Sequence, residues 1–178
     1  MNTVILVAIA EEVPDNLQHR DDVFLTGVGK VNAALTAATV IALYRPKLII
    51  NFGTAGGITV NSGLHECTEF VQRDMQCTDL GFASGQTPYE DQIRLGVPGL
   101  TCSSGDNFVS NPDLEIPADV VDMEAYAIAK ACHKNKVEFL CFKYVTDSAD
   151  SQASYDWTQL VSQGEKHYIE KLKQLSLY

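Results

Sequence analysis

The sequence of 178 residues predicts a mixed α/β fold, in which a largely parallel β-sheet is flanked by helices. Two observations support this prediction. Apolar runs of strand length alternate with segments of helical periodicity, and such alternation is typical of a parallel sheet covered on both faces. No repeat, low-complexity segment or linker interrupts the chain, so we expect a single domain over residues 1–178.

The individual elements follow from local patterns along the chain. Strands are expected in the apolar runs at 3–10, 22–26, 47–52, a pair within 64–78, 100–104, 118–122 and 137–146. Helices are expected over 30–44 and 123–134, where small and apolar residues recur at helical spacing. A last helix would place on one stripe Trp157, Leu160, Val161, Tyr168, Leu172 and Leu175. Glycines and prolines between 79 and 98 predict a long loop.

Composition narrows the functional classes. The formal net charge of −10 argues against nucleic acids and membrane surfaces as partners, because both are polyanionic, and favours a neutral or cationic small molecule. The five cysteines contain no CxxC pair and the four histidines are scattered, so we expect reduced thiols, a cytoplasmic protein, no metal and no cofactor. The first ten residues have no basic start, and no apolar run has the length of a membrane span.

Polar residues gather where the expected strands end. These clusters are Glu11–Glu12, "GVGK" (27–30), "GTAGG" (53–57), "SGDNF" (104–108), "DME" (122–124) and "TDSAD" (146–150). In open α/β sheets ligands bind at the carboxyl ends of the strands. The coincidence predicts a binding site at that edge of the sheet.

The two glycine-rich segments allow more than one interpretation from the residues alone. "GVGKVNAA" could expose backbone amides to a phosphate or could simply form a tight turn from a strand into a helix. It lacks the third glycine of the dinucleotide-binding fingerprint. "FGTAGG" could let a ligand approach the backbone or could let the chain turn.

The acidic residues also leave alternatives open. Glu12 could be a general base, or the pair Glu11–Glu12 could be solvated acids at a helix N-terminus. Asp122 is expected to cap the helix that follows it, and Glu124 could either serve the site or interact with the helix dipole. Asp147 ends an apolar strand, where it could belong to the site or cap the next segment.

Five segments occur in an order that is far more specific than any one of them. "GVGKVNAA", "NFGTAGG", "SGDNFV", "VDMEAYAIA" and "KYVTDSAD" together resemble the nucleoside phosphorylase superfamily, and within it most closely the 5′-methylthioadenosine/S-adenosylhomocysteine nucleosidases. The resemblance extends over nearly the whole chain. It implies cleavage of the N-glycosidic bond of a purine nucleoside.

The resemblance assigns the chemical roles to two acids. Glu12 matches the general base that activates water, and Asp147 matches the acid that protonates the leaving purine. Phe108 matches the aromatic residue that stacks on the base, with the backbone of Val109 reading the base edge. Carboxylates suit this reaction because its transition state resembles an oxocarbenium ion.

The sugar contacts are implied in the same way. Thr54 matches a hydroxyl residue beside the sugar, Met123 packs under it, and Glu124 holds the ribose hydroxyls. Lys143 stands where many members of the family carry an arginine, so it offers one compact charge instead of a planar fork. The chain is also shorter than most relatives between Glu12 and "GVGK" and around 88–100, which predicts a more open pocket.

The loop "LGFASGQTP" resembles the segment that closes the partner's pocket in dimers of this family, with Leu80, Phe82 and Pro88 as its apolar contacts. We therefore expect a homodimer. The leading interpretation is a hydrolase acting on an adenine nucleoside. The alternatives are a phosphate-dependent phosphorylase, which usually supplies several arginines that are missing from the matched segments here, and a nucleoside-binding sensor without catalysis.

Overall fold

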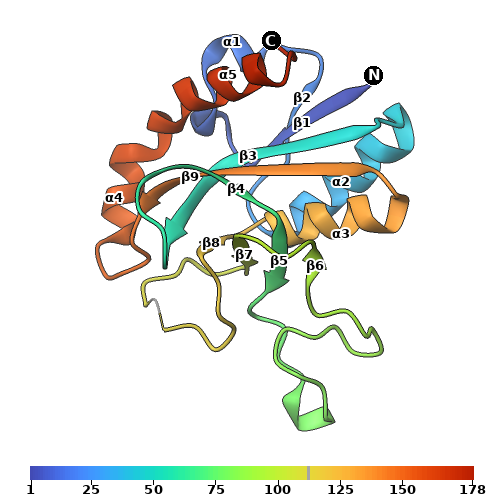
Figure 1. Cartoon of the computed structure of the whole chain (residues 1–178), viewed down its shortest axis with the longest axis vertical. Helices are drawn as coiled ribbons and strands as arrows, with labels where there is room; N and C mark the ends of the chain where they lie inside the picture. The colour runs from blue at the N-terminus through green and yellow to red at the C-terminus, as the bar shows by residue number, and fades with distance from the viewer. Residues whose placement is uncertain (112) are drawn as a thin grey trace.

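The computed structural model describes residues 1–111 and 113–178, and it shows the mixed α/β fold that the sequence predicts (Figure 1). Within these residues nine strands form one sheet: β1 (Thr3–Val7), β2 (Val23–Leu25), β3 (Leu48–Gly57), β4 (Gly63–Cys67), β5 (Glu69–Gln72), β6 (Leu95–Gly96), β7 (Thr101–Ser104), β8 (Val120–Asp122) and β9 (Glu138–Asp147). The α-helices are α1 (Asp15–Gln18), α2 (Lys30–Tyr44), α3 (Ala125–Asn135), α4 (Ala153–Leu160) and α5 (Glu165–Gln174). Short 3-10 helices are η1 (Ala10–Glu12), η2 (Thr78–Leu80) and η3 (Val161–Gly164).

The sheet is organised around β3. Its first part lies between β1 and β9, both parallel to it, while Gly56 and Gly57 pair with β8 in the antiparallel direction. The strand order is β2-β1-β3-β8-β7-β5-β6, and β9 lies beside β3 with β4 on its outer side. The pairing register with β9 shifts between Ala55 and Gly56, where β3 begins to pair with β8 and still lies beside β9. The ends of β1, β3, β8 and β9 therefore meet.

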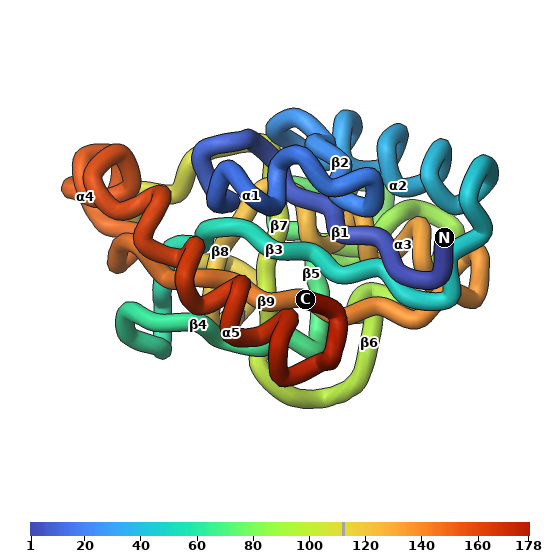
Figure 2. The backbone as a smooth tube through the Cα atoms, turned by 90° about the horizontal axis from the view of Figure 1, so that it is seen from above, coloured from blue at the N-terminus to red at the C-terminus, as the bar shows by residue number. Residues whose placement is uncertain are grey.

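Helices cover both faces of the sheet (Figure 2). Successive side chains of β1 point to opposite faces: Val4 and Leu6 pack with α2 and α3, and Ile5 and Val7 pack toward α5, where Tyr168 is fully buried. This two-sided burial explains why β1 is apolar at consecutive positions. None of the helices in the described ranges is long and apolar enough to cross a membrane.

Three elements differ from the sequence-based expectations. β3 continues through "GTAGG", so the turn, one of the two interpretations of this segment, is not formed, and Gly57 leaves no room for a side chain beside the carbonyl oxygen of Val60. β4 and β5 are consecutive but pair with other strands, so the expected strand pair is wrong. The last helix is broken at η3, where Gly164 packs against Tyr144 of β9 with no room for a side chain.

Candidate active site

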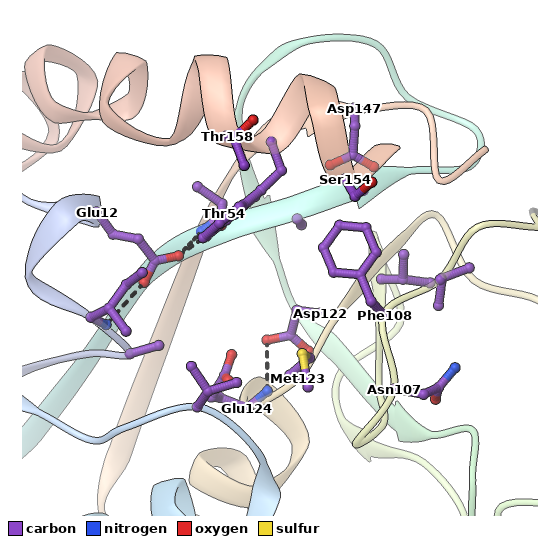
Figure 3. Close-up of a pocket in the computed structure, with 18 of the residues that line it drawn as sticks. Glu12, Thr54, Asn107, Phe108, Asp122, Met123, Glu124, Asp147, Ser154 and Thr158 are labelled. Carbon is purple, nitrogen blue, oxygen red and sulfur yellow. Dashed lines mark hydrogen bonds between the residues drawn. The ribbon is translucent and has the colours of Figure 1, made fainter. Parts of the chain in front are cut away.

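A cavity of about 380 Å³ opens at the ends of β1, β3, β8 and β9, between α4 and the segment around Phe108 (Figure 3). Its volume lies in the range of small-molecule sites. It is lined by Ala8, Ile9, Glu12, Val28, Thr54, Ala55, Gly56, Arg73, Asn107, Phe108, Val109, Val121, Asp122, Met123, Glu124, Asp147, Ser154, Trp157 and Thr158. Four of these residues are buried acids, Glu12, Asp122, Glu124 and Asp147, and the charged groups of the lining are therefore mainly carboxyl groups.

Glu12 is held in one orientation by β3. It is buried in η1, and its Oε1 accepts hydrogen bonds from the backbone N–H and from the hydroxyl of Thr54, each at 2.7 Å. Its Oε2 receives only a long contact, 3.4 Å, from the backbone N–H of Ile9. One carboxylate oxygen is thus fully engaged, and the other can accept a proton.

Asp122 and Lys143 form a buried ion pair beneath the cavity. The Nζ of Lys143 lies 2.8 Å from Oδ2 of Asp122, and both side chains are 1% exposed. Burial opposes the ionisation of Asp122, but the ammonium of Lys143 and the hydroxyl of Ser104 lower its pKa below the ordinary value. Oδ2 also accepts from the backbone N–H groups of Glu124 and Ala125, so Asp122 caps the start of α3, as expected from the sequence.

Glu124 is the N-cap residue of α3, and among the described residues no cationic side chain forms an ion pair with it. Its Oε1 accepts a hydrogen bond of 2.8 Å from the backbone N–H of Gly29. Burial and the nearby charge of Asp122 raise the pKa of Glu124 to about 7. The residue therefore exchanges a proton near neutral pH unless a ligand supplies hydrogen-bond donors.

Asp147 ends β9 and lies across the cavity from Glu124 (Figure 3). Burial raises its pKa, and the hydrogen bonds that it accepts from the N–H of Ala149 and the hydroxyl of Thr146 only partly offset this effect. A carboxyl group with a raised pKa can hold a proton and give it to a ligand.

The "GVGK" segment forms a tight turn in which two amides are already engaged. Gly27 and Gly29 have φ values of 79° and 94°, which favour glycine. The N–H groups at the start of α2 already donate to carboxylates of this chain: Gly29 to Glu124 and Lys30 to Asp106, the latter at 2.7 Å. These amides are therefore not available to a phosphate.

Phe108 is 47% exposed and faces the cavity, next to the buried Val109 (Figure 3). The preceding segment is fixed by Arg73, whose guanidinium donates to the carbonyl oxygens of Ser103, Asp122, Gly105 and Asn107. Arg73 is the one cationic side chain among the described lining residues. The guanidinium of Arg73 thus donates hydrogen bonds to the protein backbone and not to a ligand.

The residues singled out from the sequence fall into two groups. Those that line the cavity are Glu12, Thr54, Phe108, Val109, Met123, Glu124 and Asp147. Those that do not line it are Lys143, which lies behind Asp122, and Leu80, Phe82 and Pro88, which belong to the loop around η2 that projects away from α4 and α5 in Figure 1. Over the described ranges no cluster of histidine, cysteine, aspartate and glutamate could hold a metal ion.

Sequence patterns missed several lining residues, of which Trp157 is the most informative. Helical spacing assigned it to the apolar stripe of the last helix, but it faces the cavity and donates a hydrogen bond of 2.9 Å to the hydroxyl of Thr54. Its indole N–H was the available signal, because a half-buried tryptophan usually has a hydrogen-bond acceptor.

Comparison with known proteins gives consistent matches. A model of the phosphorylase superfamily matches residues 16–103 and 83–177. A 5′-methylthioadenosine/S-adenosylhomocysteine nucleosidase of Glaesserella parasuis is 30% identical over 165 residues, covering 76% of this chain and 71% of that protein.

Solved structures show the same fold. The nucleosidase of Streptococcus pneumoniae, in complex with 8-aminoadenine, superposes with a TM-score of 0.83 at 19% identity and covers 96% of both chains. Futalosine hydrolase of Helicobacter pylori gives a TM-score of 0.83 at 19% identity and covers 92% of this chain and 91% of that one. At these identities the likeness establishes the fold alone.

Glu124 makes the free energy of unfolding depend on pH. Its pKa is about 7 in the folded chain and ordinarily 4.5, so the folded state binds the proton more tightly and is stabilised at low pH. This stabilisation is lost as pH rises through about 7.

Glu124→Gln should therefore raise the free energy of unfolding relative to wild type at pH 8 by about 2–3 kcal/mol, with little difference at pH 5. Urea unfolding of both proteins checks this, and parallel pH profiles would contradict it. Asp147 contributes with the same sign in both proteins, so it cancels in the difference.

Proposed function

The chain belongs to the phosphorylase superfamily, and from this premise we propose that it is a hydrolase that cleaves the N-glycosidic bond of a purine nucleoside with water as the nucleophile. The substrate is an adenine nucleoside with an apolar or thioether 5′ group, such as 5′-methylthioadenosine or S-adenosylhomocysteine. The relative that is 30% identical, a nucleosidase for these two compounds by name, supports this substrate class.

The orientation of Glu12 is the observation that carries the proposal. Thr54 occupies Oε1 with two donors, which leaves Oε2 to accept a proton from water. Ionised carboxylates at the cavity stabilise a cationic transition state and repel an incoming anion. Water attacks the anomeric carbon, its proton passes to Glu12, and the bond between sugar and base breaks.

The electrons of the broken bond go to the purine, which needs a proton to leave. Asp147 supplies it, in keeping with its raised pKa. Phe108 stacks on the base and the backbone of Val109 reads its edge. Met123 lies under the sugar, and Glu124 accepts hydrogen bonds from the ribose hydroxyls, which favour its ionised form. Lys143 acts on the sugar site through Asp122 and not by direct contact, since it does not line the cavity.

Phosphorolysis is the less favourable alternative. Phosphate needs free cations and amides. Arg73 is engaged with four carbonyl oxygens, and the amides of Gly29 and Lys30 are engaged with carboxylates. A sensor without catalysis would not need a base and an acid on opposite walls of one cavity, so Glu12 and Asp147 argue against that alternative.

Analysis of the reaction products tests the proposal. Purified protein incubated with 5′-methylthioadenosine in phosphate-free buffer should release adenine and the free sugar, at a rate that added phosphate does not increase. Chromatography separates both products. A strict requirement for phosphate, with a sugar 1-phosphate as product, would contradict hydrolysis.

We also propose that the chain forms a homodimer in which the loop around η2 covers the partner's cavity. Leu80 and Tyr89 of this loop are exposed, Tyr89 at 94%. A second apolar surface begins at the cavity: Val28 lines it, and Val31 and Leu35 continue from it along α2, all three exposed. Exposed apolar surface of this kind is typical of an interface.

The proposal includes a cytoplasmic location. It is supported by the five free cysteines, because disulfides are rare in the reducing cytoplasm.

Substitution on α2 tests the dimer. Leu35 is 66% exposed, so Leu35→Asp should leave the fold intact but place two buried charges in the interface. Sedimentation at micromolar concentration should change from dimer to monomer, and the KM should rise because the partner's loop is lost. Tyr178→Asp, on the opposite face of the molecule, is the control and should remain dimeric. A wild-type monomer with full activity would rule out the interface.

A further inference from the structure

Trp157 of α4 is connected to Glu12 by a chain of two hydrogen bonds. The indole Nε1 donates to Oγ1 of Thr54 at 2.9 Å, and the same Oγ1 donates to Oε1 of Glu12 at 2.7 Å. An indole N–H can only donate, so the hydroxyl of Thr54 accepts from Trp157. Its single proton is then directed at Glu12.

This arrangement restricts Glu12 more than Thr54 alone would. A free threonine hydroxyl rotates and can exchange partners, including a water or a sugar hydroxyl in the cavity. With the lone pair engaged by Trp157, the rotamer that serves Glu12 is selected. Oε1 remains saturated by the backbone and the hydroxyl of Thr54, and Oε2 remains the oxygen that receives the proton.

The connection also links Glu12 to α4, the helix that forms one wall of the cavity. Of the eight residues of α4 only Ala153 is buried. Within the described chain, Trp157 makes the only side-chain hydrogen bond between α4 and the rest of the protein. Ser154 and Thr158 of the same helix also line the cavity. The helix packs against β9, and the hydrogen bond of Trp157 connects it to Thr54 of β3.

We propose that Trp157 is a positioning residue for the hydrolytic reaction: it acts through Thr54 to fix the orientation of Glu12, so that Oε2 of Glu12 receives the proton of the attacking water. This inference rests on the proposed function. It assigns to Trp157 an effect on turnover in addition to its contribution to the apolar wall.

A double-mutant cycle tests the inference. Trp157→Phe keeps an aromatic ring in the wall and removes only the donor. It should lower kcat about threefold to tenfold, the effect of one net hydrogen bond, with KM changed by less than about twofold. In a Thr54→Val background, where the connecting hydroxyl is absent, the same change should cost less than about twofold. In a Thr54→Ser background, which restores the hydroxyl, the loss should return.

Each other outcome is decisive. Equal losses in the wild-type and Thr54→Val backgrounds, or no loss in any background, would overturn the positioning role while leaving the hydrolase intact. Absence of turnover in the wild-type protein would overturn the proposed function and the positioning role together. Trp157 is the only tryptophan of the chain, so its fluorescence reports directly on this contact. The emission should change in Thr54→Val and be retained in Thr54→Ser, and identical spectra for all three proteins would contradict the hydrogen bond.

Discussion

The buried ion pair between Lys143 and Asp122 is the interaction on which the site depends. The ammonium has one close carboxylate partner, although Glu12 and Glu124 also lie near it. Because Asp122 takes this partner, it stays ionised and can hold the first amides of α3, while Glu124 is left with a raised pKa. The pair also explains Gly53, because a side chain there would lie 3.0 Å from Nζ of Lys143 and 3.5 Å from Oε1 of Glu12. Replacing one partner of such a pair is strongly destabilising, typically by about 3–5 kcal/mol.

Each of the other carboxylates is fixed by donors from a different part of the chain. Thr54 of β3 holds Glu12, Gly29 before α2 holds Glu124, and Ala149 after β9 holds Asp147. No single segment therefore forms the site. The fold brings these donors together because β1, β3, β8 and β9 end in one place, and the site consists of the residues that directly follow or complete these strand ends.

Local sequence signals predicted the parts of the fold that depend on local chemistry. The helix α2 has the predicted bounds, since glycine precedes it and the Arg45–Pro46 pair ends it. The polar clusters at strand ends also indicated where the cavity lies. Three features escaped prediction because they depend on contacts between distant residues. The glycines of β3 are required by close approaches and not by a turn, Lys143 pairs with an acid from another strand, and Trp157 has a helical spacing that does not distinguish a cavity wall from a core.

Proton transfer from Asp147, at the end of β9, to the leaving base is the step on which the proposed reaction depends. It is tested most directly by measuring Asp147→Asn on two substrates, a purine nucleoside and a nitrophenyl riboside, whose leaving group needs no proton. Asparagine keeps the size and a hydrogen-bond donor but cannot transfer a proton. Turnover of the purine nucleoside should fall by about 10²–10⁴-fold, the usual contribution of a general acid, while the nitrophenyl riboside should be affected far less. Equal losses on both substrates would contradict it and would make Asp147 an orienting residue.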